Sequence, residues 1–161
     1  MTDGSIHTIL SFRSGGRFLA APIEAVREVL PAFEILRTPG LASVSPGVIS
    51  LHGEVLPVID SGLLIGGDPV ALHPQCKFVV IDTALRAFAL LVETVDDLIE
   101  VADGQLVKAS PARALLPVTG IVPVGEEMLL LLDVDACSEM ERAADGKMLD
   151  AVLSDAEGGI R

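Results

Sequence analysis

Two stretches of the chain match each other without a gap, and this internal repeat constrains the fold more than any other feature. Residues 47–60 read GVISLHGEVLPVID and residues 120–133 read GIVPVGEEMLLLLD, so that apolar residues align at nearly every core position. Each stretch holds two apolar runs separated by a polar turn, as in a β-hairpin. A repeat of this kind predicts one β-rich folding unit that is present twice.

Other segments fit the same reading of the chain. Apolar runs at 9–12 and 18–23 flank a Ser-Gly-Gly turn, and runs at 78–82 and 88–92 flank a polar loop, so both pairs are predicted to form hairpins. Short strands with turn residues between them predict a mainly β fold, built as two small barrels side by side.

Three segments show apolar residues near helical spacing. We expect a short helical turn at 24–30 and a short helical or irregular segment at 93–98. An amphipathic C-terminal helix is expected over 139–153, interrupted or kinked near Gly146. The polar residues 154–161 are expected to form a frayed tail.

Composition excludes several classes of function. The net charge of -12 repels nucleic acid and anionic lipid, and no apolar run approaches the ~20 residues of a membrane-spanning helix. The N-terminus lacks the basic and apolar regions of a signal peptide, so we expect a cytoplasmic protein. Cys76 and Cys137 are widely separated and are expected to be free thiols, and the scattered histidines predict no metal site and no cofactor.

One motif suggests chemistry. Asp60-Ser61-Gly62 is the tripeptide that surrounds the catalytic carboxylate of aspartic proteases, so a dimeric acid protease is an alternative function. The repeat places Asp133 at the equivalent position, but Val134 and Asp135 follow it and lack the hydroxyl and the glycine. We therefore expect each aspartate to end a strand and accept hydrogen bonds from the next turn.

A cluster of acidic residues marks the second half of the chain. The default interpretation is a solvated face, and a docking surface for a basic partner is the alternative. Its members are Glu93, Asp96, Asp97, Glu100 and Asp103.

The order of several motifs resembles the CheW family of bacterial chemotaxis adaptors. The most specific block is 47–60, with its Gly-Val-Ile start and Pro-Val-Ile-Asp end. The remaining matches cover residues 6 to 153 in the order of the family: Phe18, Pro22, Ile23, Val26, Glu28, Val29, Thr38-Pro39, 79–81, 90–93, Val95, Ser110-Pro111, 119–121 and 129–133.

The resemblance implies a fold and a set of partners. It implies one domain over 6–153 with two intertwined, five-stranded SH3-like barrel subdomains, one at approximately 15–80 and the other in the remainder. Members of the family carry out no chemistry. They hold the regulatory domain of a CheA-type histidine kinase against the cytoplasmic tips of chemoreceptors, without nucleic acid and without membrane insertion. A module that binds a small ligand between the barrels is a third possibility.

The resemblance also implies site residues. Val26 and Val29 in the first half, and Val95 and Leu98 in the second, would line a groove for a receptor helix, with ordinary core packing as the alternative role. Glu28 would meet a basic partner or remain solvated.

Two positions depart from the pattern of the family. His52 stands where members usually carry an Arg that is associated with partner binding, and Ser61-Gly62 replaces a usual Leu-Arg. Because imidazole lacks the guanidinium fork, this change predicts a divergent member with altered partner choice, for example in a pilus-type chemosensory pathway.

Overall fold

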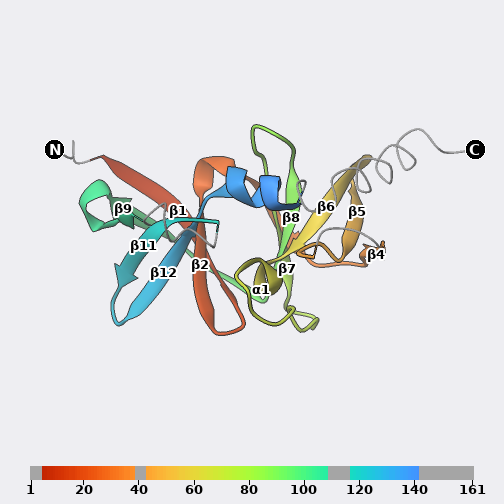
Figure 1. The fold of residues 1–161 in the computed structure, drawn as a ribbon, viewed down its shortest axis with the longest axis horizontal. Coiled ribbons are helices and arrows are strands. Elements are labelled where there is room, and N and C mark those ends of the chain that lie inside the picture. Colours follow the sequence, from red (N-terminus) through yellow and green to blue (C-terminus); the bar gives the residue numbers. More distant parts are fainter. Residues whose placement is uncertain (1–4, 39–42, 109–116, 142–161) are drawn as a thin grey trace, which may run out of the picture.

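The strands form two sheets that lie side by side, sheet A on the left of Figure 1 and sheet B on the right. The computed structural model describes residues 5–38, 43–108 and 117–141. Sheet A has the order β10-β11-β12-β2-β1-β9, with the bounds Val107–Lys108, Val118–Val124, Glu127–Leu132, Arg17–Pro22, Ile6–Ser14 and Thr94–Ala102. Sheet B has the order β3-β7-β8-β6-β5-β4, with the bounds Val26–Pro31, Lys77–Ile81, Phe88–Val92, Glu54–Asp60, Gly47–Leu51 and Leu36–Arg37.

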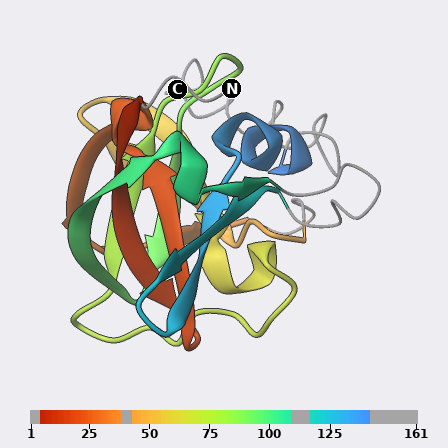
Figure 2. The same ribbon diagram turned by 90° about the vertical axis from the view of Figure 1, so that its left-hand side faces the viewer.

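The internal repeat is visible in this topology. Reading sheet A from β10 and sheet B from β4, each strand has a counterpart, and both sheets contain one parallel pair at the same place, β12 with β2 and β6 with β8. The two halves of the chain exchange their first hairpins. Hairpin β1–β2 joins β9–β12 in sheet A, which faces the viewer in Figure 2, and hairpin β7–β8 joins β3–β6 in sheet B.

Three apolar clusters hold the sheets. A shared cluster draws side chains from both sheets, and each sheet also encloses a cluster of its own, around Phe78 and Leu56 in sheet B and around Phe18 and Leu129 in sheet A. Full burial of one such side chain stabilises the fold by about 1.5–3 kcal/mol. The buried members of the shared cluster are Leu10, Phe12, Leu19, Ala21, Val44, Ile59, Leu64, Ile65, Val79, Ile81, Phe88, Leu90, Val92, Leu132 and Cys137.

Both repeats end in an aspartate that starts a helix. The carboxylate of Asp60 accepts hydrogen bonds from the backbone N–H groups of Gly62 at 2.8 Å and Leu63 at 3.1 Å, at the start of α1 (Ser61–Leu64). Asp133 accepts one from Ala136 at 3.1 Å and precedes the helical segment 134–141. These bonds satisfy donors that the first helical turn leaves unpaired. The role predicted for these aspartates at the ends of strands is confirmed.

The prediction of a mainly β fold with two subdomains side by side is confirmed, with one change in number. Among the described residues each sheet has six strands instead of five, because each receives a two-strand hairpin in addition to four strands of its own half. The predicted domain boundaries stay a prediction, and their last part falls outside the described residues.

The two segments predicted as short helical or irregular turns are mostly strand. Only η1 (Ile23–Ala25) is helical in the first segment, and β3 occupies the rest of it, while β9 begins at Thr94 in the second segment. The C-terminal helix starts earlier than predicted, at residue 134, because Asp133 caps it, and residues from 142 onward lie outside the described part. Within the described part, no helix has the length and apolar character needed to span a membrane.

Substituting Gly47 tests the close approach of β4 to β5. A Cβ atom at Gly47 would lie 2.1 Å from the carbonyl oxygen of Leu36, and one at the equivalent Gly120 would lie 2.5 Å from that of Val107. Because backbone must move, Gly47→Ala is expected to lower the free energy of unfolding by about 1–3 kcal/mol in urea denaturation. Gly104→Ala is the control, since no atom lies within 4 Å of a Cβ built there. Equal stability of both variants and wild type would contradict the contact.

The buried thiols give a second prediction. Burial, and then the charge of Asp133, raises the pKa of Cys137 to about 12, so the native thiol keeps its proton where an unfolded thiol loses it. The stability that this proton contributes is complete below the ordinary thiol pKa and is lost as the pH rises toward 12. Since Cys76 is also buried, Ellman's reagent at pH 8 should detect neither cysteine natively and both in urea. Rapid reaction of one native thiol would contradict the burial.

Candidate functional site

The two residues predicted to line the groove from the first half, Val26 and Val29, lie on the edge strand β3. Val26 pairs with Ile81 and Val29 with Val79, and these two β7 partners belong to the shared cluster. Residues directly opposite each other in an antiparallel pair point to the same face of the sheet. Val26 packs against the shared cluster, and Val29 extends beyond it with 40% of its surface exposed.

The second half repeats this arrangement on the edge strand β9. Val95 pairs with Phe12 and Leu98 with Leu10, and these β1 partners also belong to the shared cluster. Val95 packs against the cluster, and Leu98 is 61% exposed. The structure therefore places the four predicted groove residues as two equivalent pairs, each with one inner residue against the shared cluster and one outer residue exposed to solvent.

A bulge in each edge strand explains the spacing that resembles a helix. Residues three apart in a regular strand point to opposite faces. The register of β3 against β7 shifts between Val26 and Glu28, and the register of β1 against β9 shifts between Leu10 and Phe12. An extra residue in a bulge returns the third residue to the same face.

A buried hydroxyl completes the bulge in β9. The Ser11 Oγ donates to the carbonyl oxygen of Asp97 at 2.9 Å and accepts from its backbone N–H at 3.0 Å. The side chain of Ser11 thus supplies the hydrogen bonds that the interrupted ladder does not.

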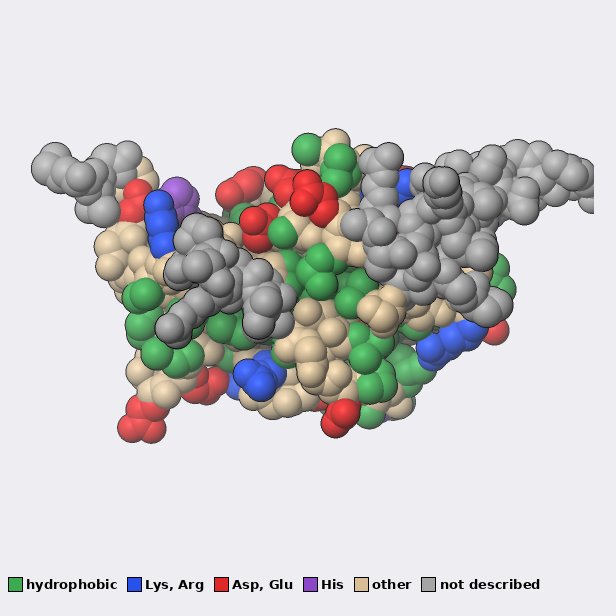
Figure 3. Space-filling view, in the orientation of Figure 1, with side chains coloured by type: hydrophobic (Ala, Val, Ile, Leu, Met, Phe, Trp, Pro, Cys, Tyr) green, Lys and Arg blue, Asp and Glu red, His purple; other side chains and the backbone are tan. Residues whose placement is uncertain are grey.

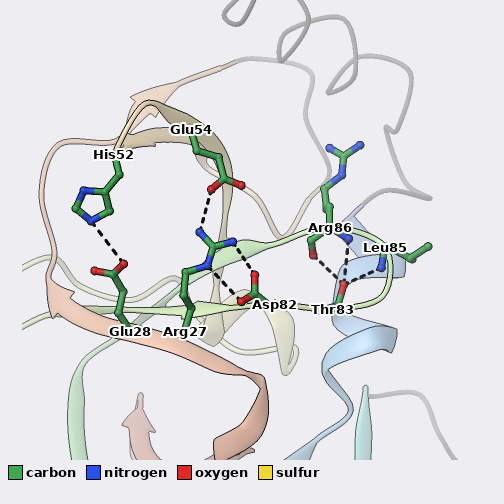
Figure 4. Close-up of polar contacts among 8 residues, drawn as sticks. All are labelled: Arg27, Glu28, His52, Glu54, Asp82, Thr83, Leu85 and Arg86. Carbon is green, nitrogen blue, oxygen red and sulfur yellow. Dashed lines mark hydrogen bonds and ion pairs between the residues drawn. The ribbon is translucent and has the colours of Figure 1, made fainter.

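Figure 4 shows a polar cluster between β3 and the β5–β6 turn. The guanidinium of Arg27 donates to Asp82 at 2.6 and 3.2 Å and to Glu54 at 2.9 Å. Its hydrogen bonds hold the pKa of Arg27 above the ordinary value, and the bonds with Asp82 have a larger effect than the bond with Glu54. Beside them, the Nε2 of His52 lies 3.6 Å from Glu28, an ion pair that requires a protonated imidazole.

His52 has an uncommon backbone conformation. Its φ of 51° is left-handed, as is that of Gly53 at 81°, and the pair forms the two-residue turn between β5 and β6. Positive φ at both central residues is typical of a type I′ hairpin turn. This turn carries the imidazole to Glu28 on β3, and so the structure brings these two predicted site residues together.

A second polar cluster occupies the equivalent place in sheet A. The guanidinium of Arg13 donates to Asp96 at 2.9 Å and to Glu127 at 2.8 and 3.1 Å, and its carbon lies 4.4 Å from the ring centre of Phe18. Hydrogen bonding to Arg13 lowers the pKa of Glu127. The hydrogen bonds of Arg13 raise its own pKa, and the bond with Glu127 has a larger effect than the bond with Asp96. Sequence reasoning did not find either arginine, because their partners lie far away in the chain.

The outer edges of the two sheets expose apolar side chains that sequence reasoning also missed. Leu36 on β4 pairs with Val48 and is 65% exposed, and Val107 on β10 pairs with Ile121 and is 60% exposed. Val48 and Ile121 occupy the same position of the internal repeat. An open hollow of about 820 Å³ adjoins β4 and is lined by Phe33, Glu34, Ile35, Leu36, Arg37, Val48, Ile49, Ser50 and Val55.

Asp60 is not placed as a proteolytic carboxylate. It is 3% exposed, and besides its two cap bonds it accepts a hydrogen bond from the backbone N–H of Val70 at 3.0 Å. Ser61 is buried, and a Cβ at Gly62 would lie 2.0 Å from the carbonyl oxygen of Asp68. The backbone of the following loop therefore packs directly against the Asp60-Ser61-Gly62 motif. The carboxylate braces the turn after β6.

The acidic residues of the second half are divided among structural contacts and solvent. Glu93 accepts from the backbone N–H of Gly15 at 2.9 Å, and Asp103 pairs with His7, while Asp97 and Glu100 are exposed on β9. Figure 3 shows further acidic side chains at the top centre, where the helical segment 134–141 lies in Figure 1. No group of three or more His, Cys, Asp or Glu residues in the described ranges could hold a metal ion.

Two relatives match over most of this chain and most of their own length. It is 28% identical over 144 residues to the probable chemotaxis protein CheW of Rhizobium etli, covering 84% of this chain and 90% of the relative. It is 29% identical over 157 residues to the chemotaxis protein CheW of Rhizobium meliloti, covering 89% and 96%. A shorter match, 34% identical over 83 residues, joins 52% of the chain to 46% of protein PilI from Pseudomonas aeruginosa.

The fold has a solved counterpart. The crystal structure of the scaffolding protein TtCheW from Thermoanaerobacter tengcongensis superposes with a TM-score of 0.72 at 20% identity, over 80% of this chain and 89% of that one. A sequence model of the family described as CheW-like domain matches residues 8–142. The chain therefore belongs to the CheW-like domain family.

Proposed function

We propose that this protein is a non-enzymatic, cytoplasmic adaptor that couples chemoreceptor tips to the regulatory domain of a CheA-type histidine kinase. Membership of the CheW-like family and relatives that are named chemotaxis proteins support this function. The observation that carries the proposal is the repeated pair of apolar residues on the edge strands, in which the outer residues Val29 and Leu98 stay open.

The receptor would bind at these two edge strands. An amphipathic receptor helix offers apolar side chains at intervals of one turn, and such helices bind to apolar surfaces with a few anchor positions. Val29 and Leu98 are the exposed anchors, and Val26 and Val95 connect them to the shared cluster. A helix that contacts both strands would engage both halves of the repeat.

The kinase would bind at the outer edges of the sheets. Strands β4 and β10 each have two residues, and no other strand of the described residues pairs with their outer edges. Each presents an exposed aliphatic side chain, Leu36 or Val107. Edge strands with apolar side chains are suited to contact with another sheet. Because these two edges belong to different sheets, one chain could contact two kinase or adaptor neighbours.

If a receptor helix binds at Val29 and Leu98, a negative charge at both positions should weaken its binding. Val29→Asp together with Leu98→Asp places carboxylates where a receptor helix would bury methyl groups, and it is expected to weaken binding of a receptor-tip fragment about 10-fold or more by titration calorimetry. Leu85→Asp, at a residue of similar exposure in the β7–β8 loop, is the control and should bind like wild type. Binding at full strength by the double variant would remove the assignment.

The β5–β6 turn predicts the effect of His52. His52→Asn keeps a residue that tolerates the left-handed conformation but removes the ion pair with Glu28, so we expect weaker binding of the kinase regulatory domain or the receptor tip by about two- to fivefold. His52→Arg restores a guanidinium fork and should bind more tightly than wild type. Unchanged affinity in both variants would show that His52 has no part in the interface.

A further inference from the structure

We propose that Arg13 and Arg27 are positioning residues, which fix the two edge strands in the geometry that presents Val29 and Leu98 to a partner. This inference rests on the proposed receptor site. It concerns how the chain holds that site in place, and neither arginine is assigned a contact with the partner.

The two arginine clusters occupy equivalent positions. Glu54 and Glu127 are the first residues of β6 and β12, at the same place in the internal repeat. Asp82 directly follows Ile81, which pairs with Val26, and Arg13 directly follows Phe12, which pairs with Val95.

The edge-strand members of the clusters correspond as well. Arg27 follows Val26 on β3, and Asp96 follows Val95 on β9. Each cluster therefore joins the same three places: the bulge of an edge strand, the end of the neighbouring strand, and the start of β6 or β12.

The charges of the two clusters are exchanged. In sheet B the edge strand supplies the arginine, Arg27, and the neighbouring strand supplies the acid, Asp82. In sheet A the neighbouring strand supplies the arginine, Arg13, and the edge strand supplies the acid, Asp96. The glutamate contributes the second acid in both. Both clusters therefore keep the ion pair between the two strands, although the arginine and the aspartate have changed places. This is expected if the connection between the strands matters and the sign of the charge that faces a partner does not.

The bulges make such a bridge useful. A bulge interrupts the hydrogen bonds of the ladder, and an edge strand has a neighbour on one side only. The outer residues Val29 and Leu98 come directly after the bulges, so their positions depend on how the bulges are held. A guanidinium that hydrogen-bonds to two carboxylates fixes the relative orientation of the strands that carry them as well as their separation.

The exposure of the clusters separates positioning from global stability. The side chains of Arg13 and Arg27 are 36% and 34% exposed, and exposed ion pairs contribute little to the free energy of unfolding. Loss of the ion pairs around one arginine should therefore move the edge strand locally, while the apolar shared cluster keeps the fold intact.

The exchanged charges allow a rescue experiment in the full chain. Arg13→Asp leaves Asp96, Glu127 and the new acid together, so amide hydrogen exchange over residues 94–98 should accelerate and the affinity for a receptor-tip fragment should fall about fivefold. Adding Asp96→Arg rebuilds in sheet A the arrangement seen in sheet B. The double variant should return both measurements to within about twofold of wild type.

The control and the outcomes keep the two proposals apart. Arg17→Asp makes the same change of charge at the exposed start of β2 and should leave both measurements unchanged. Wild-type exchange and affinity in Arg13→Asp, or failure of the double variant to recover both, would overturn the positioning role. If wild type itself does not bind the receptor fragment, the proposed function fails, and rescue of the exchange rates alone still decides whether the cluster holds β9.

Discussion

The shared cluster between the sheets is the contact on which the rest of the structure depends. Each half of the chain gives its first hairpin to the sheet of the other half, so both sheets need both halves. The crossings are short: η1 leads from β2 into β3, and Glu93 alone separates β8 from β9. The first strand after each crossing is therefore an edge strand that starts against the common core. This places Val26 and Val95 on the same cluster and leaves Val29 and Leu98 at its border.

Much of this fold could be predicted from the sequence because the repeat carries long-range information. Aligning 47–60 with 120–133 identifies the paired hairpins, and the aspartate that ends each stretch proves to be a helix cap. The exchange of hairpins could not be derived, because the order of elements is the same whether each half folds on itself or trades strands. Helical spacing in 24–30 and 93–98 was misleading, since a bulge also brings residues three apart onto one face.

The site was only partly accessible from the sequence. The family resemblance identified the apolar pairs on β3 and β9, and the structure gives them equivalent environments. Arg13 and Arg27 escaped because their partners come from elements 27 to 114 residues away in sequence. Leu36 and Val107 escaped because the loops that precede the two repeats differ in length, which shifts β4 and β10 out of the alignment.

As an adaptor of this kind, the protein would act by holding its partners in position. The clusters around Arg13 and Arg27 are partly exposed and add little to global stability, yet they connect the bulges to the turns of β6 and β12. The shared cluster holds the two sheets together, and the edge strands carry the exposed residues Val29 and Leu98. Under the proposed function, small changes in the edge strands would alter affinity for a partner and leave the fold unchanged.

The most direct test of the account is a titration of the isotope-labelled chain with a receptor-tip helix, followed by backbone amide chemical shifts. The account predicts that residues 26–29 and 95–98 shift together, with the same dependence on helix concentration, because one helix engages both edge strands. Shifts confined to one edge strand, or to surfaces away from both, would contradict it.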